Sequence, residues 1–134
     1  MRFKGVILCV LCMILLVGCS VQKITSDNAK ERSYELVMEE DIPEEVKAPI
    51  QERKEEPFLL TYADQGWLYI ARGYGKQETD GYEIQVESFG ESENAIVLKT
   101  IFLGPEPDEE IQEAPTFPYI VIRTKYSNKY VMTE

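Results

Sequence analysis

The sequence contains no histidine, and its three cysteines, Cys9, Cys12 and Cys19, all lie within the first nineteen residues. Nucleophilic catalysis usually requires a serine or cysteine that a histidine activates, so the commonest hydrolase chemistries are excluded from the rest of the chain. A disulfide is excluded there too, and we expect an ordinary hydrophobic core to stabilise the fold. These absences predict a protein that is not an enzyme.

Basic residues are also scarce, since 14 Lys and Arg face 24 Asp and Glu and give a net charge of −10. Nucleic-acid binding needs a basic surface, so this class of partner is excluded. Among so many carboxylates some lie close together by chance, and carboxylate pairs therefore indicate no catalysis. The densest acidic run, between Glu106 and Glu113, has the spacing of no known metal loop, and we expect neither a metal nor a cofactor.

The first nineteen residues have the organisation of an export signal. Arg2 and Lys4 precede an apolar run over residues 6–17, and a small residue, Gly18, stands before Cys19. A run of this length with these flanks is typical of a secretory signal peptide rather than of a membrane-spanning helix. An ordinary signal peptide with a chance cysteine, or an uncleaved anchor, is the alternative.

The spelling Leu-Val-Gly-Cys at residues 16–19 resembles the lipobox of bacterial lipoproteins. The resemblance implies that residues 1–18 are removed and that Cys19 becomes a lipidated N-terminus, with a diacylglyceryl group and a further fatty acid such as palmitate. Two acyl chains hold a protein stably on a membrane, whereas one chain is marginal. The implied location is the extracytoplasmic face of a bacterial cell membrane. Residues 19–33 are polar and predict a flexible tether of roughly 20 Å, followed by a domain over residues 34–134.

The centre of this domain is the stretch from Trp67 to Phe89. An apolar run, residues 67–71, leads into a loop over residues 73–81, where Gly73 and Gly75 let the chain leave the strand. Residues 82–86 then alternate, with Tyr82, Ile84 and Val86 on one side, which is typical of a half-buried strand. We expect the two strands to form a hairpin whose loop projects from the sheet, with Trp67, Tyr69, Ile84 and Val86 in the core.

The remaining pattern predicts short strands and one helix. Ile42, Val46 and Ile50 recur every four residues after Asp41, which indicates an amphipathic helix that is capped by Asp41 and covers one end of the sheet; a solvated acidic linker is the alternative. Further strands are expected at residues 34–38, 58–62, 95–103, 120–124 and 130–132, with 95–103 central and buried on both faces. The fold class is therefore mainly β: a small antiparallel β-sandwich or partly open barrel of about six strands with one short helix.

Residues 104–115 form a long acidic loop bracketed by prolines. Long loops without secondary structure are often functional or mobile, so a binding role and a simple solvated connection are equally consistent with the pattern.

Over residues 58–125 the sequence resembles the C-terminal domain of the protease complex subunit PrcB family. The resemblance rests on Gly75, on Thr79-Asp80-Gly81-Tyr82, on a long strand followed by Gly104-Pro105-x-Pro107, and on Pro118-Tyr119 before an Ile/Val strand. It implies a membrane-anchored, non-catalytic subunit that binds or stabilises a secreted or surface protease. Asp80 stands where the family usually has a glycine.

The same loop is similar to that of the chagasin-like inhibitors of cysteine proteases, which insert loops of a β-sandwich into an active-site cleft. This similarity implies that Thr79, Asp80, Gly81 and Tyr82 form the central binding loop, with Pro118 and Tyr119 as candidate flanking contacts. We therefore expect a partner-binding loop made of Gly75, Thr79, Asp80, Gly81 and Tyr82. The Arg-Pro-Trp element of those inhibitors is absent. A structural or solute-binding envelope lipoprotein, in which residues 75–82 are only a well-made connection, is the remaining alternative.

Overall fold

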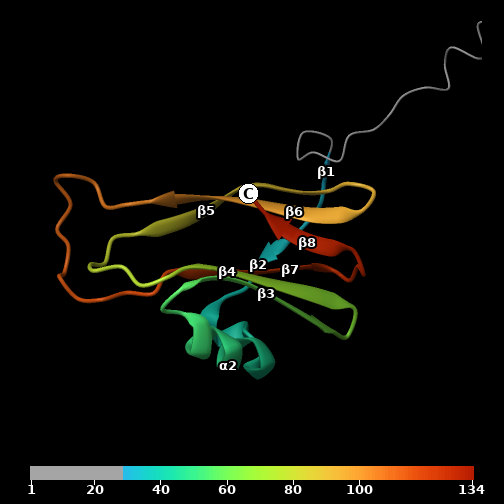
Figure 1. Ribbon diagram of the computed structural model, residues 1–134, viewed down its shortest axis with the longest axis horizontal. Coiled ribbons are helices and arrows are strands. Elements are labelled where there is room, and N and C mark those ends of the chain that lie inside the picture. Colours follow the sequence, from blue (N-terminus) through green and yellow to red (C-terminus); the bar gives the residue numbers. More distant parts are fainter. Residues whose placement is uncertain (1–28) are drawn as a thin grey trace, which may run out of the picture.

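The computed structural model describes residues 29–134 (Figure 1). The predicted signal peptide, Cys19 and most of the predicted tether therefore lie outside the described residues. The elements in chain order are β1 (Lys30–Glu31), β2 (Glu35–Leu36), the short 3₁₀ turn η2 (Glu39–Asp41), α2 (Glu44–Arg53), β3 (Pro57–Asp64), β4 (Trp67–Tyr74), β5 (Glu83–Glu91), β6 (Ala95–Leu103), β7 (Tyr119–Lys125) and β8 (Tyr130–Thr133).

The strands form two four-stranded sheets, in the orders β1-β5-β6-β8 and β2-β7-β4-β3. The sheets lie face to face, and α2 covers the outer face of the second sheet (Figure 1). The predicted mainly-β sandwich with one helix is confirmed. Neighbouring strands are antiparallel except for β6 and β8, which run parallel because the chain crosses from β7 to the other sheet before β8 begins.

The predicted hairpin of residues 67–71 and 82–86 is wrong, because β4 and β5 lie in different sheets. A two-residue turn at Gln65 and Gly66, both with positive φ (49° and 83°), pairs β4 with β3 along its whole length. The other edge of β4 is occupied by β7. With both edges taken, β4 has no place for β5, and residues 75–82 cross from one sheet to the other.

Two cores stabilise this arrangement. The inner core, between the sheets, is built by residues of β4, β5, β6 and β7: Leu68, Ile70, Phe89, Ile96, Leu98 and Ile122. The outer core, between the second sheet and the helical segment, is built by Ile42, Val46, Ile50, Phe58, Tyr69, Ala71 and Val121. As predicted, Trp67 and Tyr69 pack in one of these cores and Val86 packs in the other, whereas Ile84, also predicted there, is half-buried and belongs to neither.

The strand buried on both faces is β4, because it lies in the layer between α2 and the other sheet. The sequence predicts residues 95–103 in that role, and there the prediction is only half correct. Residues 95–98 of β6 are buried, but Ile101 and Leu103 point outward and are 37% and 40% exposed. Across the described residues, no helix covers that outer face as α2 covers the other sheet.

The helical segment has the predicted buried face, since Ile42 just before α2 and Val46 and Ile50 within it are all at most 6% exposed. The helix itself begins at Glu44, after Pro43, and Asp41 belongs to the preceding turn η2 instead of capping the helix. It also covers a face of the sheet rather than one end, because its apolar stripe packs on the outward side chains of β3, β4 and β7.

The end of the predicted tether at residue 33 is also too late. Lys30 and Glu31 pair with Glu91 and Gly90 as strand β1. Arg32 donates to the Glu91 carboxylate and to the Thr124 hydroxyl, each at 2.9 Å. These bonds place the polar segment from residue 30 onward within the domain.

Candidate partner-binding site

The predicted binding loop, residues 75–82, lies at the same end of the sandwich as the acidic loop that follows β6 (Figure 1). It leaves β4 at Gly75, whose φ of 82° is in the left-handed region. The backbone there is packed against the end of α2, because the amide of Lys76 donates to the carbonyl of Glu55 at 3.0 Å. A Cβ at Gly75 would also lie 3.2 Å from that oxygen, so glycine serves both the bend and the close approach.

The two loops are joined by an isolated β-bridge between Gln77 and Thr116. Their backbones exchange hydrogen bonds of 2.8 and 3.0 Å, and the Thr116 hydroxyl donates to the carbonyl of Thr79 at 2.7 Å. Residues 75–82 therefore do not project alone from a sheet. They form one layered tip with the end of the acidic loop.

Asp80 makes the second connection between the loops. Its amide donates to the carbonyl of Gln112 at 3.2 Å, and its carboxylate accepts the amide of Gln112 at 2.8 Å. The Thr79 hydroxyl donates to the carbonyl of Asp80 at 3.0 Å. Both side chains thus bond within the tip, and an aspartate has a local structural purpose where the family usually has glycine.

Gly81 takes the positive φ of this loop, at 90°, and Asp80 does not. A Cβ on Gly81 would lie 2.9 Å from the Cβ of Pro105 and 3.3 Å from the side chain of Ile111. The Asp-Gly pair thus lets the chain turn directly beneath the acidic loop.

Tyr82 anchors the far end of the loop, as predicted. Its ring stacks on Phe102 with a centroid distance of 5.1 Å, and Tyr74 also stacks on Phe102, at 4.3 Å. The hydroxyl of Tyr74 is hydrogen-bonded to Thr100. This aromatic stack bridges the two sheets below the tip, and aromatic pairs of this kind typically contribute about 0.5–1.5 kcal/mol each beyond their burial.

Pro118 and Tyr119, the predicted flanking contacts, lie differently from one another. The carbonyl of Pro118 accepts the amide of Tyr74 at 3.1 Å and so closes the base of the tip. Tyr119 packs against the outer core and donates its hydroxyl to the carboxylate of Glu39 at 2.7 Å. Burial and that carboxylate raise the pKa of Tyr119 to about 12. The Tyr119 ring therefore belongs to the helix side of the domain.

The outward surface of the tip is acidic with one large apolar side chain. Residues 106–115 are exposed throughout, and Ile111 is 41% exposed among the carboxylates. Lys76 and Glu78 are exposed on the neighbouring loop. The sequence does not identify Gln77, Gln112 or Thr116 as part of the site. Only the fold brings Gln77 together with the other two residues, which lie more than thirty positions further along the chain.

Within residues 29–134, no group of three or more His, Cys, Asp or Glu side chains is arranged to hold a metal ion. In the same part of the chain, no helix has the length and apolar character needed to span a membrane.

The fold and the site define a β-sandwich domain with two interlocked loops at one end. The family model described as PrcB C-terminal matches residues 68–125, which run from β4 to β7 and include both loops. The match confirms the resemblance to this family over that segment, and it suggests a protease-complex-associated subunit. No curated protein and no solved structure matches the chain.

Proposed function

We propose that this chain is a lipid-anchored, non-catalytic subunit of a bacterial surface protease complex, and that the interlocked tip of residues 75–82 and 104–118 contacts the protease. The observation that carries the proposal is the family match over residues 68–125, which contains the whole tip. The lipobox spelling at residues 16–19 supports the anchor at Cys19.

The geometry of the tip supports a rigid contact surface. Three backbone hydrogen bonds and two side-chain bonds hold the two loops together among residues 77–116. A loop pair ordered before binding loses less conformational entropy when the partner docks. The exposed carboxylates and Ile111 fit a partner surface that presents basic groups around an apolar depression.

The contribution of Thr79 and Asp80 to binding is therefore indirect. Their polar atoms bond inside the tip, so these residues shape the surface, whereas Glu78 and Ile111 face outward. The variant that tests the contact without loosening the tip is Glu78→Arg. Glu93→Arg, in the exposed turn between β5 and β6 at the other end of the sandwich, makes the same charge change and is the matched control.

The experiment is affinity capture of the full chain from detergent-solubilised membranes of its native host, followed by a protease assay of the eluate. We expect the original chain and Glu93→Arg to retain a protease with its activity intact, and Glu78→Arg to retain much less. If a captured cysteine protease is inhibited instead, the chain acts as an inhibitor. Elution without any protease refutes the complex.

The anchor is tested separately with the Cys19→Ala variant and an alkyne-labelled fatty acid. We expect the label on the original chain alone. Labelling that survives the substitution refutes lipidation at Cys19.

A further inference from the structure

The outermost strand of the helix-covered sheet, β3, has a free edge. In the order β2-β7-β4-β3 it pairs with β4 on one side, and no other described strand pairs with it. Asp64 and Trp67 flank the two-residue turn, so they form a hydrogen-bonded pair, and hydrogen-bonded pairs then recur at every second residue along the ladder. By this alternation Leu59, Thr61 and Ala63 direct their backbone N–H and C=O groups away from β4.

An exposed edge of this kind is a template for another strand, and proteins usually protect it with charges, bulges or prolines. The sequence of β3 is Pro-Phe-Leu-Leu-Thr-Tyr-Ala-Asp, so its proline and its single charge stand at the two ends. Its pairing with β4 runs without a bulge from Pro57 to Asp64. The middle of the edge is regular and uncharged.

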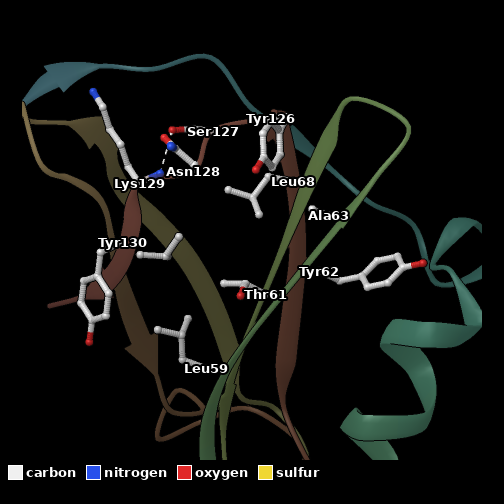
Figure 2. Close-up of a pocket in the computed structure, with 11 residues that line it drawn as sticks. Leu59, Thr61, Tyr62, Ala63, Leu68, Tyr126, Ser127, Asn128, Lys129 and Tyr130 are labelled. Carbon is white, nitrogen blue, oxygen red and sulfur yellow. Dashed lines mark hydrogen bonds between the residues drawn. The ribbon is translucent and has the colours of Figure 1, made fainter.

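A pocket of about 410 Å³ opens on the inner side of this edge, between β3 and the segment that contains β8 (Figure 2). Leu59, Leu68 and Val131 supply its apolar lining. Tyr126 and Tyr130 stand at its rim and are 53% and 74% exposed. The ring of Tyr62 points away from this pocket toward α2 (Figure 2).

A second, smaller pocket of about 50 Å³ lies on the helix side of the same strand, lined by Glu45, Val46, Pro49, Leu60, Thr61, Tyr62 and Tyr69. Glu45 is the acidic residue of this pocket, and Asp64 is the last residue of β3, two positions after Tyr62. Partial burial, with smaller contributions from the charges of Glu45 and Asp64, raises the pKa of Tyr62. The two pockets thus offer different chemistry on the two sides of one edge.

We propose that β3 binds an extended segment of a partner protein as an added strand, with apolar side chains entering the inner pocket and basic side chains reaching Glu45 on the helix side. Successive side chains of a strand point to opposite faces, so alternating residues of the segment meet the two pockets in turn. Backbone hydrogen bonds to Leu59, Thr61 and Ala63 supply affinity and the pockets supply selectivity, as in other β-strand additions. The acidic helix side, in a chain of net charge −10, selects basic over acidic residues.

This edge lies outside the residues of the interlocked tip, and its proposed role goes beyond the contact with the protease. The test uses the full chain in detergent and two fluorescein-labelled octapeptides, one alternating Val and Lys and one alternating Val and Glu. Affinity is measured by fluorescence anisotropy, and the bound edge is located by hydrogen exchange with mass spectrometry. We expect the Val-Lys peptide to bind at least tenfold more tightly and to slow exchange in residues 58–64.

Two variants and one control assign the binding to the edge. Thr61→Pro removes an outward N–H, and we expect at least a tenfold loss of affinity. Glu45→Lys is expected to weaken the Val-Lys peptide about fivefold and to strengthen the Val-Glu peptide, so it tests the edge even if Thr61→Pro does not fold. Glu44→Lys makes the same charge change on the adjacent helix residue, which does not line the small pocket, and serves as the control.

The proposal is overturned if neither peptide binds, or if binding leaves hydrogen exchange in residues 58–64 unchanged. It is also overturned if Glu44→Lys weakens binding as much as Glu45→Lys does. Protection of residues 58–64 that grows with protein concentration in the absence of peptide would assign the edge to a second copy of this chain. None of these results bears on protease capture through Glu78, so failure here is distinguishable from failure of the proposed function.

Discussion

Gly73 provides the sharpest test of the packing between β3 and β4. It lies within β4, pairs with Phe58, and directs the α-hydrogen that a side chain would replace toward the Phe58 ring of the outer core. A Cβ added there would lie 2.1 Å from one ring carbon of Phe58 and 2.6 Å from two others. Ordinary contacts begin at 3.4 Å, so the ring would have to move by about 1.3 Å. Phe58 is only 7% exposed, which leaves it little room.

We therefore expect Gly73→Ala to destabilise the domain by about 3 kcal/mol, the upper end of the usual cost of overpacking. For a domain of this size the melting temperature should fall by roughly 12 °C. Trp67 is the only tryptophan of the chain, and the Arg123 guanidinium lies 4.3 Å from its ring centroid, so its fluorescence reports unfolding in urea. The measured quantity is the free energy of unfolding.

A double-mutant cycle separates steric overlap from any general effect of the substitution. Phe58→Leu removes the ring atoms that the new methyl group would meet, so the double variant should be about 2 kcal/mol more stable than the sum of the single changes predicts. Additive effects, or a Gly73→Ala variant as stable as the original chain, would refute the reasoning.

Three further outcomes are expected. Asp80→Ala removes the acceptor for the Gln112 amide, so proteolysis of the tip should accelerate while the free energy of unfolding falls by only about 1 kcal/mol. A loss of more than about 3 kcal/mol would contradict this local role of Asp80. Folding raises the pKa of Tyr119 above its ordinary value of 10.0 to about 12, so its stabilising contribution is complete below pH 10 and is lost as the pH rises toward 12. The free energy of unfolding, measured against pH, should therefore decline less steeply for Tyr119→Phe than for the original chain. An equally steep decline in both proteins would contradict this role of Tyr119. The hydrogen bond from Lys129 lowers the pKa of Glu91, so the stabilisation by this carboxylate is present above pH 4.5 and is lost on acidification. Glu91→Gln should remove this acid dependence at a cost of about 1 kcal/mol in the free energy of unfolding at neutral pH. Equal acid sensitivity of the two proteins would contradict this role of Glu91.

The two glycines before the tip differ in how well the sequence predicts their roles. The sequence predicts that both Gly73 and Gly75 let the chain leave its strand. Gly75 does so, with a positive φ, but Gly73 lies inside β4 and makes room for Phe58. A sequence marks a position without a side chain, and only the packed neighbour identifies the reason.

The binding-loop prediction was limited in a similar way. The turn chemistry of Asp80-Gly81 and the anchoring by Tyr82 are local properties, and both could be predicted from the residues. The docking of this loop onto Gln112 and Thr116 could not, because no sequence pattern couples two polar loops more than thirty residues apart. In the structure Thr79 and Asp80 bond within the tip, whereas Glu78 and Ile111 are exposed.

Local periodicity by itself determined most of the extended segments of the domain and the apolar face of the helical segment and of residues 82–86. Alternation over residues 82–86 identified a half-buried strand, and the spacing of Ile42, Val46 and Ile50 identified the buried face of the helix. These features depend on side-chain directions along a single element. The pairing of strands depends instead on which edges remain free after the tight turns have closed. The tertiary structure alone therefore decided that β4 and β5 belong to different sheets and that β3 keeps an open edge.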